Sequence, residues 1–306
     1  MRLSLDRRLR GIKEVRKLRR ADAVVVSHPK CGRTWVRALL SYYYSGSRNL
    51  AVTELLGFDN YNVRDRTIPR IFFTHDNYLV DVTGEEKLLA SYAARPVVLL
   101  VRDPRDWVVS AFHQTSRRGD RLKQSIRGKD APHLRELSAF LRDPVWGLER
   151  YLRFLERWAE RMDRLPRSLL VRYEDLHADT AGGLERLLGF LGEGADPHWV
   201  RHAVAEASFE RMREKERSGT FGASSRRFGA PVNDPNAFKV REGRVGGWRR
   251  WFAEADVEWI ERTMAERMPR GFGYRDDERI ESGHAVIAPV AVSPVEGGAR
   301  PAERAP

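Results

Sequence analysis

Residues 29–35, Pro-Lys-Cys-Gly-Arg-Thr-Trp, combine the backbone and side-chain types that bind anions. Gly32 lets a ligand approach the backbone closely, Thr34 offers a hydroxyl donor, and Lys30 brings a positive charge. The lysine precedes the glycine, whereas the Walker A loop of nucleotide hydrolases has Gly-Lys-Ser/Thr after an earlier glycine. We therefore expect a phosphate loop that is not Walker A. The alternative is an ordinary turn with a solvated lysine.

An arginine and a serine form a second candidate site. Arg102 directly follows the apolar run of residues 97–101, and Ser110 lies eight positions later. A forked guanidinium and a hydroxyl suit a terminal phosphate. The alternative is structural, because Arg102 could instead pair with Asp103 or Asp106.

The third candidate is a glycine-rich basic segment at residues 238–250. Gly243 permits close backbone approach to a phosphate, and Arg241 could supply charge-assisted hydrogen bonds. Trp248 could anchor the segment by packing. A flexible basic turn that contacts nucleic acid is the alternative.

Strands and helices must position these residues, and short β-branched runs indicate where the strands lie. We predict strands at residues 23–27, 71–75, 97–101 and 169–173, and helices at about 34–43, 105–114 and 180–191. Asp143 and Pro144 predict the start of an amphipathic helix that runs through Trp146 to Met162. Strands that alternate with helices indicate an α/β domain with a mostly parallel sheet, and ligands gather at the carboxyl ends of such strands.

The composition limits the classes of protein that fit. The 306 residues include 55 Lys and Arg against 43 Asp and Glu, a net charge of +12, and 42% are hydrophobic. These values suit a globular protein that meets an anionic partner. The single cysteine excludes an intrachain disulfide and a cysteine-based zinc site. No apolar run could span a bilayer and the N-terminus resembles no secretory signal, so we expect a cytoplasmic protein.

The positive charge is concentrated in residues 1–20 and 211–250, each with a net charge of +7. Leu5, Leu9 and Ile12 predict a basic amphipathic helix at residues 1–20. It could lie on an anionic membrane or nucleic acid, or pack its leucines on the domain. We expect this helix to lie outside the active site of a catalytic domain at residues 21–278. Residues 117–135 are predicted to be a mobile loop and residues 279–306 a disordered tail.

Together the motifs resemble, in order and rough spacing, those of the cytosolic-type sulfotransferases that use 3′-phosphoadenosine 5′-phosphosulfate (PAPS). Residues 29–35 are similar to the family's Pro-Lys-Ser-Gly-Thr-Thr-Trp loop, Arg102 and Ser110 to its 3′-phosphate pair, and residues 241–249 to its Arg-Lys-Gly-x-x-Gly-x-Trp-Lys motif. Residues 172–176 and 207–209 resemble two segments beside the nucleoside. The resemblance covers about residues 22–275. It implies a P-loop-like three-layer fold with a central, mostly parallel sheet flanked by helices.

The resemblance also implies roles for individual residues. His75 matches the family's catalytic base, and Lys30 would stabilise charge on the departing phosphate. No metal is expected. Several positions depart from the family: Phe73 stands for a lysine, Ala207 lacks a hydroxyl, and Glu242 replaces a common lysine, which would weaken the 3′-phosphate site. The implied PAPS-binding residues are Lys30, Gly32, Arg33, Thr34, Trp35, Arg102, Ser110, Tyr173, Phe209, Arg241 and Gly243.

The predicted activity is transfer of the PAPS sulfuryl group to a hydroxyl or amine of a small-molecule, lipid or carbohydrate acceptor. Peripheral membrane contact through residues 1–20 is a further possibility. A small-molecule kinase with a related phosphate loop is one alternative, which would lose activity in EDTA. A nucleic-acid-binding protein is the other, and its binding would fall steeply with salt. An anionic nucleotide accounts for the charge of residues 211–250, so we expect no nucleic-acid partner.

Overall fold

A parallel four-stranded sheet forms the middle layer of the protein. The computed structural model describes residues 5–118, 136–219 and 238–281. The strand order is β2-β1-β3-β4, and all three neighbouring pairs are parallel. The predicted α/β fold is confirmed, with strands β1 (Ala23–Ser27), β2 (Ile71–Thr74), β3 (Val97–Val101) and β4 (Ser168–Arg172).

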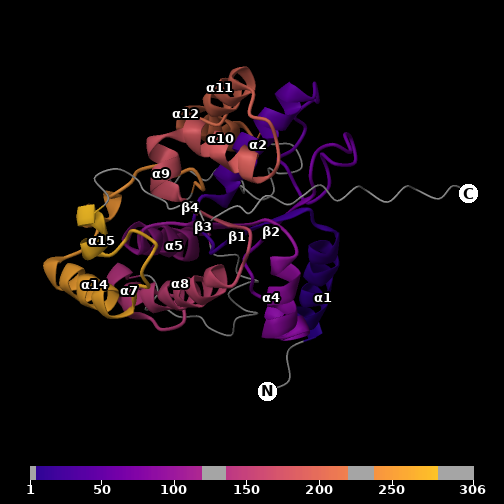
Figure 1. Ribbon diagram of the computed structural model, residues 1–306. Coiled ribbons are helices and arrows are strands. Elements are labelled where there is room, and N and C mark those ends of the chain that lie inside the picture. The colour runs from indigo at the N-terminus through magenta and orange to yellow at the C-terminus, as the bar shows by residue number, and fades with distance from the viewer. Residues whose placement is uncertain (1–4, 119–135, 220–237, 282–306) are drawn as a thin grey trace, which may run out of the picture.

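Helices cover both faces of this sheet, which explains why the two central strands are continuous apolar runs. Every residue of β1 and β3 is buried. Figure 1 shows α2 and α9 to α12 on one side of the sheet, and α1, α4, α5, α7, α8 and α14 on the other. The helical elements are α1 (Leu5–Arg20), α2 (Arg33–Ser47), α3 (Leu79–Thr83), α4 (Glu85–Ala93), α5 (Pro104–Arg118), α7 (Leu137–Arg142), α8 (Leu148–Asp163), α9 (Tyr173–Ala178), α10 (Thr180–Phe190), α11 (Pro197–Glu206), α12 (Phe209–Ser218), η4 (Gly247–Arg250), α14 (Glu254–Arg267) and α15 (Asp276–Glu281).

The predicted start of α8 is wrong. The Asp143 carboxylate accepts hydrogen bonds from the backbone N–H groups of Val145 and Trp146, both at 2.8 Å, and so closes a turn instead of capping the helix. Gly147 then has an extended conformation, and α8 begins at Leu148. The helix α5 is longer than predicted, since it continues to Arg118. The remainder of the predicted loop at 117–135 lies outside the described residues.

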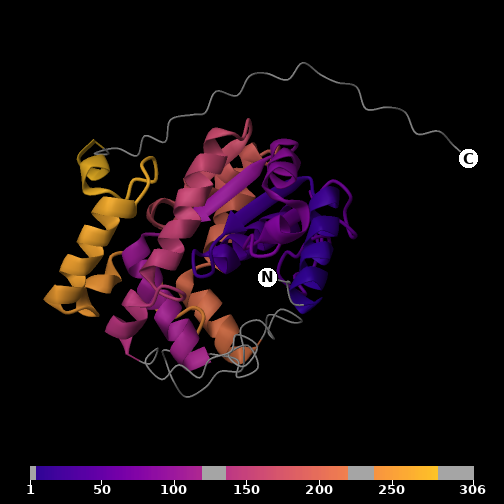
Figure 2. The same cartoon turned by 90° about the horizontal axis from the view of Figure 1, so that it is seen from below.

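The N-terminal helix packs through Leu18 and Gly11 and not through Leu5 and Leu9. Leu5 and Leu9 are 74% and 49% exposed, whereas Gly11 and Leu18 are buried. A Cβ atom on Gly11 would lie 2.4 Å from a methyl group of Val82, so the glycine permits close packing of α1 on α3. Figure 2 shows α1 at the opposite edge of the molecule from α14 and α15.

The C-terminal part of the described chain ends in α15, which continues to Glu281. The rest of the tail predicted at 279–306 lies outside the described residues. Among the described helices, none combines the length and apolarity that crossing a membrane requires.

Candidate functional site

The phosphate loop joins β1 to α2 at the carboxyl end of the sheet. Lys30 and Gly32 both have positive φ values, 77° and 89°. A Cβ atom on Gly32 would lie 2.7 Å from the ring of Tyr173, so conformation and space both require glycine here. The indole N–H of Trp107 donates to the Pro29 carbonyl at 2.7 Å. These contacts fix the loop with its backbone toward the helix N-terminus, where anions bind.

Tyr151 of α8 connects the phosphate loop to the end of β3. Its hydroxyl lies 3.3 Å from the Cys31 sulfur, accepts from the Arg102 N–H at 2.9 Å and donates to the Arg102 carbonyl at 3.0 Å. Burial raises the pKa of the Cys31 thiol to about 12. The thiol therefore stays protonated and serves as a packed donor, not as a nucleophile.

His75 follows β2 and has both ring nitrogens engaged. Nδ1 lies 2.7 Å from the Ser27 carbonyl, and since that oxygen only accepts, Nδ1 carries the proton. Nε2 lies 2.7 Å from Nη2 of Arg33 and accepts its hydrogen bond. Burial, and then the positive charge of Arg33, lower the pKa of His75 well below its ordinary value. The imidazole is therefore neutral at pH 7.

A buried ion network fixes the turn that carries His75. Asp76 has a positive φ of 53°, accepts a hydrogen bond from the Tyr92 hydroxyl at 3.0 Å, and forms an ion pair with Arg161. Arg161 of α8 also binds Glu85 of α4 at 2.6 Å. The end of β2 is thereby tied to two helices, which restricts where the His75 ring can lie.

Arg102 lies at the end of β3, and neither of the aspartates suggested by the sequence holds its side chain. Asp103 pairs with Arg105 at 2.9 Å, and Asp106 accepts from the backbone N–H groups of Gly246 and Trp248. The Arg102 guanidinium lies 4.5 Å from the ring centre of Tyr173 and donates to the Arg244 carbonyl at 3.2 Å. Its Nε is buried and has no hydrogen-bond partner among the described residues.

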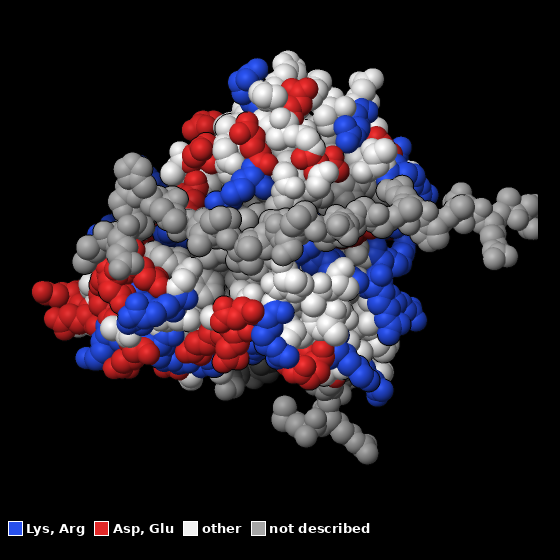
Figure 3. All heavy atoms as spheres, viewed as in Figure 1, with Lys and Arg blue, Asp and Glu red and all other residues white. Residues whose placement is uncertain are grey.

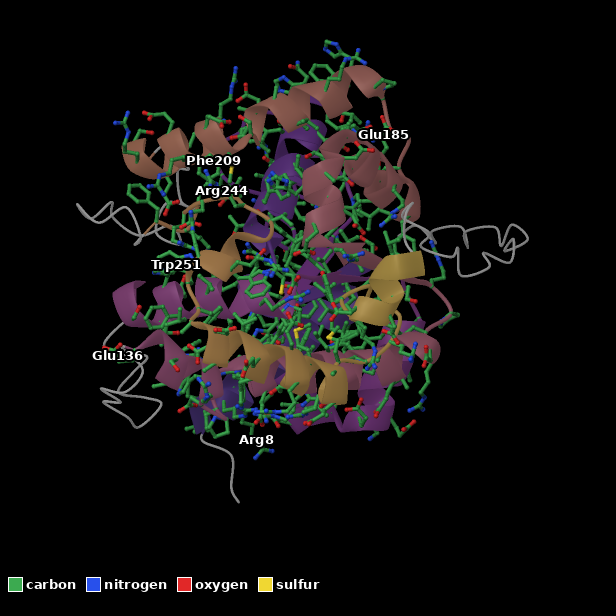
Figure 4. All side chains as sticks on the ribbon, turned by 90° about the vertical axis from the view of Figure 1, so that its left-hand side faces the viewer. Arg8, Glu136, Glu185, Phe209, Arg244 and Trp251 are labelled. Carbon is green, nitrogen blue, oxygen red and sulfur yellow. The ribbon has the colours of Figure 1, made fainter. Side chains whose placement is uncertain are left out.

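The glycine-rich segment lies against Arg102 and α5. Gly243 has a φ of 61°, and a Cβ atom there would lie 2.6 Å from the ring of Phe209. Figure 4 shows Arg244 between Phe209 and Trp251 on one side of the molecule. A small cavity in this region is lined by side chains of the second and third motifs, among them Arg102, Ser110 and Arg241. Glu242 lines it too and forms ion pairs with both Arg241 and Arg250.

A larger cavity of about 1590 Å³ brings the motifs together. Every residue implied as catalytic or PAPS-binding lines it except Arg241, which lines the adjoining small cavity. Residues as far apart in the chain as His75 and Gly243 thus line the same cavity as the loop at 29–35. The larger cavity is lined by Lys30, Gly32, Arg33, Thr34, Trp35, His75, Arg102, Ser110, Tyr173, Phe209 and Gly243.

The expectation that the N-terminal helix lies outside the active site is wrong. Asp6, Arg7, Arg10 and Glu14 of α1 line the larger cavity. The helix reaches it because Arg7 binds Asp81 at 2.6 Å and holds α1 across the end of β2. Figure 3 shows Lys and Arg atoms along the edge of the molecule where α1 lies.

Sequence reasoning missed other residues at the site. Glu14 accepts a hydrogen bond from Thr74 at 3.2 Å, and burial raises the pKa of its carboxyl. His177 donates from Nε2 to the Gly243 carbonyl at 2.7 Å and fixes the glycine segment. Neither residue belongs to a local pattern, so no sequence signal marked them. Among the described residues, no three His, Cys, Asp or Glu side chains are grouped to hold a metal ion.

Comparison with known proteins gives consistent matches. The family model described as "Sulfotransferase domain" matches residues 20–272. The rabbit (Oryctolagus cuniculus) amine sulfotransferase is 25% identical over 283 residues, covering 88% of each chain. Human (Homo sapiens) sulfotransferase 6B1 is 26% identical over 263 residues, covering 81% of this chain and 76% of its own.

Solved structures share the fold. Mouse sulfotransferase SULT7A1 complexed with PAP has a TM-score of 0.55 and 19% identity, covering 85% of this chain and 87% of its own. Retinol dehydratase in complex with androsterone and the inactive cofactor PAP has a TM-score of 0.55 and 20% identity, covering 81% of each chain.

Proposed function

Because the chain belongs to the sulfotransferase domain family, we propose that it transfers the sulfuryl group of PAPS to a hydroxyl or amine of an acceptor. One observation carries the proposal. Three motifs that are far apart in the sequence converge on one cavity, and each suits a different part of PAPS. The kinase and nucleic-acid alternatives do not account for this convergence within this family.

The nucleotide would lie across the carboxyl ends of β1, β3 and β4. Lys30, Thr34 and the backbone after Gly32 would bind the 5′-phosphosulfate. The 3′-phosphate would bind Arg102, Ser110 and Arg241, where the buried Nε of Arg102 has no hydrogen-bond partner in the described part of the chain. The aromatic rings of Trp35, Tyr173 and Phe209 would contact the nucleoside; those of Trp35 and Tyr173 lie 5.6 Å apart.

The proposed chemistry is an in-line displacement at sulfur. The acceptor oxygen or nitrogen forms a bond to sulfur while the bond between sulfur and the phosphate oxygen breaks. The acceptor proton goes to Nε2 of His75, and the negative charge stays on the phosphate of the leaving PAP, adenosine 3′,5′-bisphosphate. Lys30 would stabilise that charge.

The side of the cavity formed by α8 favours an acceptor that carries an anionic group. Arg150, Arg153 and Arg157 lie three and four residues apart on α8, which places them on one helix face, and all three line the cavity. On the α1 side of the cavity Asp6 pairs with Arg10 and Arg7 with Asp81, and on α8 Arg153 pairs with Glu149 at 3.4 Å. The α8 face therefore keeps an excess of positive charge, with three arginines against one glutamate. We propose a small molecule with a carboxylate, phosphate or sulfate, free or borne on a lipid or carbohydrate.

Isothermal titration of PAP tests the nucleotide site. We expect Arg102→Gln to weaken PAP binding at least tenfold, since a charge-assisted contact to phosphate is lost. Arg164→Gln serves as the matched control, because Arg164 pairs with Glu86 at the surface. Tight binding of ATP with no binding of PAP would sink the proposal.

An acceptor pair tests the charge preference. The wild type and Arg157→Gln would be assayed with PAPS and either 4-hydroxyphenylacetate or its methyl ester. We expect the substitution to lower kcat/KM for the carboxylate about fivefold to tenfold and to leave the ester unchanged. Equal losses for both acceptors would contradict a charge-recognition role.

Three expectations stay predictions. They are a role of residues 1–20 at a membrane, a domain boundary between residues 20 and 21, and a cytoplasmic location. Leu5 and Leu9 are exposed beside the basic side chains of α1, an arrangement typical of interfacial helices. Sedimentation with anionic vesicles would test contact, with Leu5→Gln/Leu9→Gln expected to reduce it and neutral vesicles as the control. No sedimentation of the wild type would refute it.

A further inference from the structure

The conformation of His75 leaves it unable to receive a proton from an acceptor. A neutral imidazole has one lone pair, and because Nδ1 donates to Ser27, that lone pair is on Nε2. Arg33 already occupies it with a hydrogen bond of 2.7 Å. The acceptor hydroxyl can use Nε2 only after Arg33 moves away.

When PAPS is bound, the Arg33 guanidinium has an anionic group within the same loop to bind. It lies between Gly32 and Thr34, at the first residue of α2, in the loop proposed to hold the phosphosulfate. Its long side chain lines the same cavity as Lys30 and His75. A guanidinium binds sulfuryl oxygens through charge-assisted hydrogen bonds, which are stronger than its bond to a neutral imidazole.

We propose that Arg33 is a positioning residue that closes Nε2 of His75 in the free enzyme and releases it when the sulfuryl group of PAPS binds. This inference rests on the proposed function. PAP lacks the sulfuryl group, and because Lys30 and Thr34 would hold its 5′-phosphate, Arg33 stays on His75. The lone pair of His75 Nε2 is therefore available to the acceptor only in the PAPS complex, which carries the sulfuryl group to be transferred. No covalent bond changes in this step, and the proton on Nδ1 stays in place.

Histidine titration by NMR tests the inference on the full chain labelled with ¹⁵N-histidine. We expect PAPS to raise the pKa of His75 relative to the PAP complex, because the adjacent cation leaves. The sulfuryl charge contributes to this shift as well, so the decisive quantity is a comparison between variants. In Arg33→Thr the shift between the PAP and PAPS complexes should be smaller than in the wild type by about one pH unit.

Two further measurements separate positioning from a structural role. Arg33→Lys should restore part of the PAPS-dependent shift, because lysine can also donate to Nε2 and bind sulfuryl oxygens. His198 is exposed and does not line the cavity, so its NMR signal serves as an internal control and should not differ between the complexes. The acidic limb of kcat/KM for the acceptor, at saturating PAPS, should follow the His75 pKa of the PAPS complex.

The outcomes distinguish this inference from the proposed function. If PAP and PAPS bind but shift His75 equally, or if Arg33→Thr keeps the full difference, Arg33 does not control the base. If neither nucleotide binds, the proposed function fails, and the inference fails with it.

Discussion

Replacing Glu242 should tighten binding of nucleotides that carry a 3′-phosphate. Glu242 forms ion pairs with Arg241 and Arg250, and its side chain is only 24% exposed. It lines the same small cavity as Arg102 and Ser110. A phosphate that binds there must therefore compete with a carboxylate for Arg241 and approach a like charge.

The magnitude follows from Coulomb's law. Two unit charges about 6 Å apart repel by about 0.7 kcal/mol in water and about 2.8 kcal/mol at an effective dielectric constant of 20. Loss of the contact that orders Arg241 offsets part of the gain. We expect Glu242→Gln to strengthen PAP binding by about 1 kcal/mol, or about fivefold.

Isothermal titration provides the assay and its controls. Adenosine 5′-phosphosulfate, which lacks the 3′-phosphate, should bind the wild type and Glu242→Gln equally. Glu86→Gln removes a carboxylate from an exposed pair with Arg164 and should leave PAP affinity unchanged. The difference in PAP affinity between Glu242→Gln and the wild type should decrease at high salt concentration. Unchanged or weaker PAP binding by Glu242→Gln, or an equal gain for both nucleotides, would refute the reasoning.

Three further changes test the positions around the site. Burial lowers the pKa of His28 to about 3, so between about pH 6.5 and 3 the unfolded chain binds a proton that the folded chain does not, and stability rises with pH. Urea unfolding should show that, between pH 7 and pH 5, the free energy of unfolding falls by about 2 kcal/mol less in His28→Phe than in the wild type. Equal decreases in the two proteins would contradict this. Arg161→Met should lower the free energy of unfolding by about 3–5 kcal/mol, because it leaves Asp76 buried without Arg161 as its ion-pair partner. A thermal unfolding midpoint within about 2 °C of wild type would argue against this. Gly32→Ala should weaken PAP binding at least tenfold, whereas Gly192→Ala, with a similar φ of 86° but open space around it, should not.

The core of the fold was predictable because its signals are local. The β-branched runs of β1 and β3 are buried on both faces, so composition alone marks them as strands. The three motifs, each within a single segment, predicted the nucleotide-binding residues for the same reason. The start of α8 was not predictable, because Asp143 and Pro144 suit a turn as well as a helix cap, and Gly147 decided between them.

The packing of α1 followed from its leucines only at Leu18, which is buried. Apolar spacing indicated the face of Leu5 and Leu9, but close packing on α3 instead used Gly11, a residue with no apolar side chain. This packing brings Glu14 to the cavity, although the sequence placed the helix away from the site.

The sequence by itself determined the α/β class, and it predicted a phosphate loop at residues 29–35 and His75 as the base. These depend on residue types and spacings within single elements. Only the tertiary structure decided that Arg33 occupies Nε2 of His75, that Glu242 holds Arg241, and that arginines of α8 line the same cavity as His75. These contacts join residues through the register of parallel strands and the packing of helices, and a linear pattern does not encode which charged side chains meet across such distances.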